Sequence, residues 1–108
     1  LINGCTSFAD NTASGVSNLA WGFGIMSDPN HCAHIKAGQT VKWTGDFTSH
    51  PLAAHDDRAD AGGGSPNPIT SGATSGSSSV TITFPNPGVY GYWCTVHQTM
   101  MMGAIVVD

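Results

Sequence analysis

The chain has 108 residues and carries 3 basic residues against 7 acidic ones, so its formal net charge is −4. The shortage of Lys and Arg argues against nucleic acid as a partner, because phosphate binding needs clustered cations. No apolar run approaches the roughly 20 residues that a membrane-spanning helix needs. Gly, Ser, Thr and Pro are abundant and Glu is absent, a composition that favours short strands joined by turns.

The first third of the chain predicts short strands separated by turns. We expect a short strand near residues 2–6, followed by a loop. Large apolar side chains then occupy alternate positions, which predicts that they share one face of a strand; they are Leu19, Trp21, Phe23 and Ile25. The sequence S-D-P-N at residues 27–30 is a turn signal.

The next segments lead to a histidine. Strands are expected at residues 34–36 and 39–44, with Val41 and Trp43 on one face. Gly45 and Asp46 form a predicted turn. Residues 47–53 then bring His50 to the loop end of the sheet.

A long segment at about 54–79 is rich in Gly, Ser, Asp and Pro. So little apolar content cannot form a layer of core. We therefore interpret these residues as a long surface loop, with one short strand near residues 68–70. A loop of this length inside a domain is unusual.

The last third predicts three further strands. Val80, Ile82 and Phe84 alternate with polar residues and should point inward. Residues 89–94 and 103–108 form the final two strands. Seven or eight short strands without a long helix predict an all-β fold, a Greek-key two-sheet β-sandwich, as a single domain over residues 1–108.

The segment G-Y-W-C-T-V-H-Q-T-M-M-M-G, residues 91–103, indicates a metal site. Cys94, His97 and three methionines offer a thiolate, an imidazole and a thioether, a set that suits copper better than zinc. A second histidine must come from elsewhere, and His50 is the best candidate. On spacing alone His31, His34 and His55 compete with it. Two His, one Cys and a weak axial Met make the blue-copper electron-transfer site.

The run Y-W-C-T-V-H, followed by M-M-G and the strand A-I-V-V, resembles the copper loop of the cupredoxins, the family of plastocyanin, amicyanin, pseudoazurin and azurin. The segment G-D-F-T-S-H-P-L resembles the part of that family that supplies its first histidine. The resemblance covers roughly residues 34–108. It implies a cupredoxin-like fold with one copper ion in a type 1 site, held by His50, Cys94, His97 and an axial methionine.

The axial position is open between two methionines. Family members end the loop as Met-x-Gly before the last strand, which selects Met101 and fits the strand register. Counting from His97 at the longer family spacing selects Met102 instead. Two neighbours depart from the family pattern: Pro51, where many members have Asn, and Val96, where many have Pro. Because Pro51 has no N–H, we expect the Val96 N–H to donate the hydrogen bond to the Cys94 sulfur.

The resemblance implies a small soluble protein, not an enzyme, that carries single electrons by Cu(II)/Cu(I) cycling. Its partners would be redox proteins such as a cytochrome or a copper or haem oxidoreductase, met briefly through His97 and the apolar surface around it. We expect a monomer. The alternative function is a periplasmic copper chaperone or copper-buffering protein.

Three cysteines are an odd number. If Cys94 binds metal, Cys5 and Cys32 remain, either as a disulfide or as two separate buried thiols. A disulfide implies an oxidising compartment, so we expect an exported protein, periplasmic or extracellular, with loose membrane association as an alternative. A start at Leu1 fits a mature protein whose leader was removed, or a trimmed one.

Overall fold

A computed structural model describes residues 2–56, 66–69 and 77–108. Within these residues the chain forms eight strands and two single-turn 3-10 helices. The strands are β1 Ala9–Asp10, β2 Val16–Trp21, β3 Cys32–Ile35, β4 Thr40–Asp46, β5 Leu52–Ala54, β6 Ser77–Thr83, β7 Gly88–Cys94 and β8 Gln98–Val107. The helices are η1 Ile25–Ser27 and η2 Pro29–His31.

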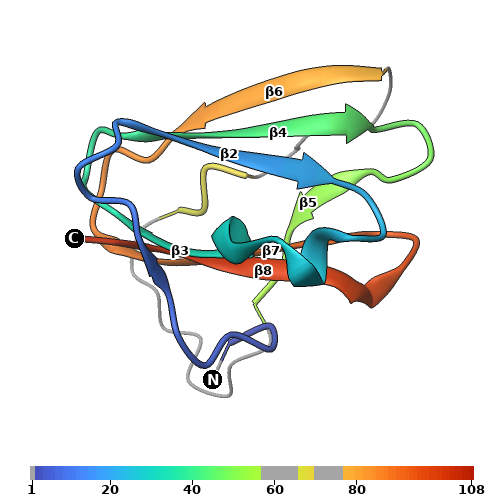
Figure 1. The fold of residues 1–108 in the computed structure, drawn as a ribbon, viewed down its shortest axis with the longest axis horizontal. Helices are drawn as coiled ribbons and strands as arrows, with labels where there is room; N and C mark the ends of the chain where they lie inside the picture. The colour runs from blue at the N-terminus through green and yellow to red at the C-terminus, as the bar shows by residue number, and fades with distance from the viewer. Residues whose placement is uncertain (1, 57–65, 70–76) are drawn as a thin grey trace.

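The strands form two sheets that face each other (Figure 1). One sheet has the order β1-β3-β8-β7-β5 and the other β2-β4-β6. Each sheet mixes parallel pairs, such as β3 with β8 and β2 with β4, with antiparallel pairs, such as β7 with β8 and β4 with β6. The all-β, two-sheet sandwich expected from the sequence is confirmed, with eight strands.

The core lies between the sheets and reaches the end of β7. Val41 and Trp43 are buried on one face of β4, as their alternation predicts. The Trp43 ring packs edge-on against Tyr92 of the opposite sheet, with centroids 5.2 Å apart. Cys94, two residues further along β7, belongs to the same buried cluster. Each large apolar side chain buried this way stabilises the fold by about 1.5–3 kcal/mol. Cys94 is therefore packed within the stable core between the two sheets.

The N-terminal strand predicted at residues 2–6 is wrong. Ile2 and Cys5 form an isolated bridge around a tight turn, in which Asn3 and Gly4 have φ of 48° and 80°. An Asn-Gly pair favours this left-handed conformation. The buried Asn3 amide donates to the carbonyls of His55, Tyr92 and Gly103 at 2.8, 3.2 and 2.9 Å. The turn is thereby fastened to the larger sheet.

The alternation predicted across residues 19–25 holds for only part of that range. Leu19 and Trp21 are buried, but β2 ends at Trp21. Ile25 is buried from η1, while Phe23 between them is 61% exposed. The glycines on either side of Phe23 weaken the strand, so the period-two pattern stops before Phe23.

The turn predicted at Gly45 and Asp46 is also misplaced. Both residues belong to β4 and pair with β6, Asp46 opposite Ser77. The chain turns after Asp46, whose carboxylate accepts hydrogen bonds from the backbone N–H groups of Thr48 and Ser49 at 3.0 and 3.3 Å. A carboxylate that binds backbone donors two and three residues ahead is a common way to start a turn.

Most of the predicted loop at 54–79 lies outside the described residues, and its ends belong to β5 and β6. The strand expected near 68–70 is not present at residues 68–69, and residue 70 is not described. Ile69, however, is fully buried in the core, and the Asn67 amide donates to the Gly91 carbonyl at 2.9 Å. The segment therefore contributes the single side chain of Ile69 to the core, which its turn-forming composition did not indicate.

Candidate metal centre

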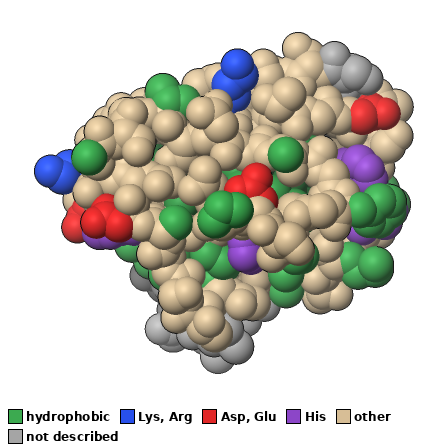
Figure 2. Space-filling view, viewed as in Figure 1, with side chains coloured by type: hydrophobic (Ala, Val, Ile, Leu, Met, Phe, Trp, Pro, Cys, Tyr) green, Lys and Arg blue, Asp and Glu red, His purple; other side chains and the backbone are tan. Residues whose placement is uncertain are grey.

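Two histidines and a cysteine meet at one end of the sandwich. His50 lies between β4 and β5, Cys94 ends β7, and His97 lies in the turn to β8. Their ligand atoms all lie within 4.8 Å of one another. The Nδ1 atoms of the two histidines are 3.1 Å apart, and Cys94 Sγ lies 3.5 Å from His97 Nδ1. Figure 2 shows histidine and apolar side chains gathered at the right-hand end of the molecule.

These separations fit a single soft metal ion. Imidazole nitrogen and thiolate sulfur bind such an ion at about 2.0–2.3 Å, so two ligands of one ion lie no more than about 4.6 Å apart. The His50–His97 and Cys94–His97 separations of 3.1 and 3.5 Å meet this limit, and the third pair, His50 and Cys94, lies within 4.8 Å. One sulfur and two imidazoles are also the donor set that selects copper. Copper therefore fits the residues present.

His50 is held on its backbone from two sides. Its N–H donates to the Asp46 carbonyl at 2.9 Å, and its own carbonyl accepts a 2.8 Å hydrogen bond from Trp21 Nε1. The Ser49 hydroxyl and N–H, both bound to the Asp46 carboxylate, lower the pKa of that carboxyl below its usual value. The turn that carries His50 therefore includes a charged carboxylate at neutral pH.

A backbone hydrogen bond joins the segment that carries Cys94 and His97 to the residue after His50. The Thr95 N–H donates to the Pro51 carbonyl at 3.1 Å, and the Met100 N–H to the His97 carbonyl at 3.0 Å. Trp93 pairs with Met102 while Cys94 pairs with Gln98, so residues 99–101 fall between two consecutive pairs. This irregular register lets β8 begin at Gln98, well before residue 103 where the last strand was expected.

The three consecutive methionines have different surroundings. Met101 is 0% exposed and lies in the same buried cluster as Cys94. Met100 is 62% exposed, and Met102 is half-buried. Of the three thioethers, that of Met101 is therefore enclosed with the cysteine.

The predicted hydrogen bond from Val96 to the cysteine is not found. Among the contacts of the described residues, Cys94 Sγ meets His97 Nδ1, and none joins it to the Val96 N–H. The Val96 side chain is 63% exposed in the turn. The sulfur therefore lacks the backbone donor that the sequence predicted for it.

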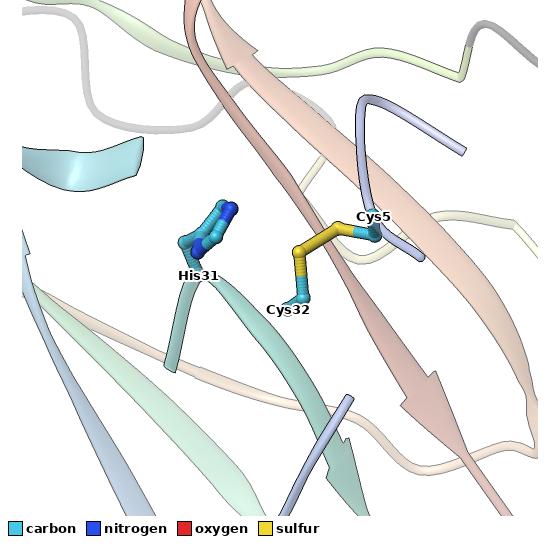
Figure 3. A group of neighbouring side chains, drawn as sticks. All are labelled: Cys5, His31 and Cys32. Carbon is cyan, nitrogen blue, oxygen red and sulfur yellow. A yellow bond between two sulfur atoms is a disulfide. The ribbon is translucent and has the colours of Figure 1, made fainter. Parts of the chain in front are cut away.

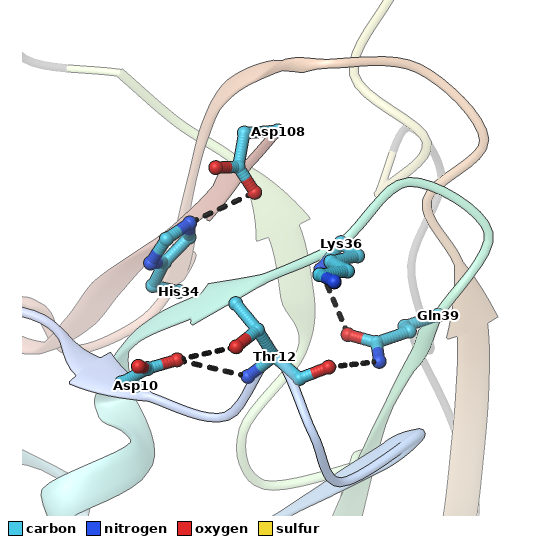
Figure 4. Close-up of polar contacts among 6 residues, drawn as sticks. All are labelled: Asp10, Thr12, His34, Lys36, Gln39 and Asp108. Carbon is cyan, nitrogen blue, oxygen red and sulfur yellow. Dashed lines mark hydrogen bonds and ion pairs between the residues drawn. The ribbon is translucent and has the colours of Figure 1, made fainter.

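The other histidines lie elsewhere. His31 neighbours Cys5 and Cys32 (Figure 3), but those two sulfurs form a disulfide, so they offer no thiolate. Of the two alternatives for Cys5 and Cys32, the disulfide is therefore the one that the structure contains. His34 Nε2 pairs with Asp108 Oδ1 at 2.9 Å beside β1 (Figure 4). The His55 ring stacks on Trp93, with centroids 3.5 Å apart.

Phe23 was missed as a site residue. Its ring meets His97 and His50 edge-on, with centroid separations of 4.4 and 5.1 Å. The sequence placed Phe23 on the same strand face as Leu19 and Trp21, because it continues their alternation. The flanking glycines, G-F-G, were the signal that the strand ends there.

Comparison with known proteins identifies the family of the chain. Residues 24–108 match the family model of copper binding proteins, plastocyanin/azurin family. No curated protein matches the chain significantly. Amicyanin from Paracoccus versutus shares 28% identity over 70% of this chain and 67% of its own, with a TM-score of 0.45. Plastocyanin from Dryopteris crassirhizoma shares 22% identity over 69% and 81%, with a TM-score of 0.49.

A larger enzyme contains a similar unit. The copper-containing nitrite reductase from Thermus scotoductus SA-01 shares 26% identity over 70% of this chain, with a TM-score of 0.50. The chain spans 19% of that enzyme's length. The family match extends over most of the chain and includes all three converging ligands. The chain therefore belongs to the plastocyanin/azurin family of copper binding proteins, the cupredoxins.

Proposed function

We propose that this protein is a single-domain electron carrier whose type 1 copper ion is held by His50, Cys94 and His97, with Met101 as the weak axial ligand. The convergence of the first three ligand atoms within 4.8 Å carries the proposal. The full burial of Met101 in the cluster that contains Cys94 supports its selection over Met100 and Met102.

Bound copper supplies a Cu(II)/Cu(I) couple. The residues of the chain hold the ligand atoms in fixed positions around the ion. Cys94 ends a buried strand, and the Thr95–Pro51 hydrogen bond joins the segments that carry the ligands. A ligand set fixed by the sandwich changes little between oxidation states. With four ligand positions filled from the chain, a substrate has no place on the metal, so we propose a carrier and not an enzyme.

Electrons would leave through His97. The side chains of Phe23, Val96 and Met100, each more than 60% exposed, surround this residue in space or in sequence. An apolar surface of this kind suits a brief encounter with a redox protein such as a cytochrome, whose interface is small.

We further propose that the protein is exported to the periplasm or the extracellular space. The Cys5–Cys32 disulfide supports this, since such bonds persist in oxidising compartments. None of the described helices has the length and apolar character needed to cross a bilayer.

Titration of the apoprotein with Cu(II) tests the proposal. We expect one equivalent to produce intense visible absorption from thiolate-to-copper charge transfer. Cys94→Ser should abolish the band, and His50→Ala and His97→Ala should weaken or shift it. His34→Ala is the matched control, because His34 pairs with Asp108 away from the site. A colourless one-to-one complex would contradict the proposal.

Copper handling is the second candidate, and the exposed thioethers favour it. Met100 is 62% and Met26 36% exposed, and thioethers prefer Cu(I). A chaperone would bind Cu(I) through Met100, without colour, and Met100→Leu would weaken that binding. A carrier would keep its copper in that variant.

A further inference from the structure

Phe23 is the most exposed of three aromatic rings packed together at the metal end. The ring centroids are 4.4 Å apart for Phe23 and His97, 5.1 Å for Phe23 and His50, and 4.8 Å for the two histidines. The angles between the Phe23 plane and the two imidazoles are 68° and 80°. Both are edge-to-face arrangements, the favoured geometry for aromatic pairs.

The exposure of Phe23 needs an explanation. A phenylalanine left 61% exposed gains little from burial. Yet its ring is in contact with both imidazoles. Phe23 is thus an exposed apolar ring in edge-to-face contact with two partly buried imidazoles.

The segment that carries Phe23 is itself anchored at His50. Trp21, two residues earlier, is buried, and its indole N–H donates to the His50 carbonyl at 2.8 Å. Trp21 also lies opposite Gly45 in the β2–β4 pair. Trp21 at the end of β2 thus contacts the His50 backbone, and Phe23, two residues after the strand, contacts the His50 ring. Both residues precede Gly24, where the match to the family model begins.

We propose that Phe23 is a positioning residue for the metal centre: its ring holds the His50 and His97 imidazoles in a converging arrangement and limits their exposure to solvent. The inference rests on the proposed ligand roles of these histidines. Its consequence is that losing the ring frees the imidazoles to rotate, which loosens copper without removing any ligand.

The apoprotein gives a test that needs no copper. In Phe23→Ala and Phe23→Leu, the ring C–H signals of His50 and His97 should shift, because the ring current is lost, and should broaden as the imidazoles sample several rotamers. Phe23→Tyr keeps the ring and should preserve both signals. Val16→Ala is the matched control, since Val16 is an exposed apolar residue at the other end of β2.

Copper release gives the second readout. With Cu(II) loaded and excess EDTA added, Phe23→Leu should lose copper about tenfold faster than the unmodified protein, which corresponds to about 1.4 kcal/mol. Its visible and electron paramagnetic resonance spectra should also change. Phe23→Tyr should restore the slow release, and Val16→Ala should not differ from the unmodified protein.

Unchanged histidine signals, or release from Phe23→Leu at the unmodified rate, would overturn the inference, because leucine keeps the apolar cover without the ring. The failure of the proposed function looks different. In that case even the unmodified protein gives no charge-transfer band with Cu(II), while the histidine signals of the apoprotein still report whether Phe23 orders the imidazoles.

Discussion

At the scale of single residues, the glycine that closes the methionine run has a steric role. A Cβ on Gly103 would collide with the His31 carbonyl oxygen and the Tyr92 hydroxyl. Those two groups are joined by a 2.8 Å hydrogen bond. Burial raises the pKa of Tyr92 well above its usual range, so the hydroxyl keeps its proton and remains the donor. The glycine of the Met-x-Gly pattern is therefore required by packing across β7 and β8.

We expect Gly103→Ala to lower the free energy of unfolding by about 1–3 kcal/mol, the usual cost of overpacking a core. The cause is that β8 must move away from Tyr92, or the hydrogen bond from Tyr92 to the His31 carbonyl must break. Chemical denaturation followed by tryptophan fluorescence measures the loss. Gly24→Ala is the control, because an added Cβ there meets no atom within 4 Å. Equal stability of the two variants would contradict the steric explanation.

At the scale of elements, the sequence predicted the strands that alternate and missed the places where they end. Val41, Trp43 and Ile82 follow a period of two, and β4 and β6 form where expected. The turns were harder to predict from the sequence. An Asp inside a turn and an Asp that ends a strand and caps the following turn look the same in the sequence. The sequence predicts Asp46 in a turn, whereas it is the last residue of β4 and its carboxylate accepts hydrogen bonds from the turn that follows.

The turn that carries His50 should respond to acid. The pKa of Asp46 is lowered mainly by hydrogen bonds from Ser49, so the ionised carboxylate stabilises the fold above the pKa of the unfolded chain. This contribution is lost as the pH falls through the lower folded pKa. Ser49→Ala should raise the pKa of Asp46, and the stability difference from the unmodified protein should shrink toward low pH.

Carboxyl-detected NMR titration measures this shift directly. Asp10 is the internal control, because its pKa is lowered in the same way by Thr12, in a separate turn (Figure 4). Only Asp46 should move in Ser49→Ala. A shift of both carboxyls, or of neither, would mean that Ser49 does not act through this local contact.

At the scale of the whole molecule, the sequence was enough to predict the sandwich and the grouping of His50, Cys94 and His97, and it offered the Cys5–Cys32 disulfide as one of two alternatives. It could not predict long-range packing that no periodicity records. Ile69 enters the core from a segment of turn-forming composition, and Asn3 reaches three carbonyls of the larger sheet. Phe23 is the same kind of case at the site, since its contact with two imidazoles depends on where β2 stops.

The disulfide should contribute strongly to global stability. It joins residues separated by 27 positions, and closing a loop of this size stabilises by about 3–4 kcal/mol on the chain-entropy model. The double variant Cys5→Ser, Cys32→Ser should lose about this amount in denaturant unfolding. Its Cu(II) absorption band should persist while it is folded, because the sulfurs lie outside the ligand group. Loss of the band in the folded variant would contradict that separation.

The tight turn at Asn3 and Gly4, in which the Asn3 side chain is buried, has a consequence for the chemical ageing of the protein. An Asn-Gly pair in a flexible chain deamidates readily, because the following nitrogen attacks the side-chain amide. Here the amide donates to three carbonyl oxygens, and the fold restrains that attack. Conversion of Asn3 to aspartate would place a carboxylate next to the same three carbonyl oxygens. The carboxylate has no N–H to donate to them, so its burial would be unfavourable. Deamidation of Asn3 would thus be expected in molecules whose N-terminal turn had already detached from the larger sheet.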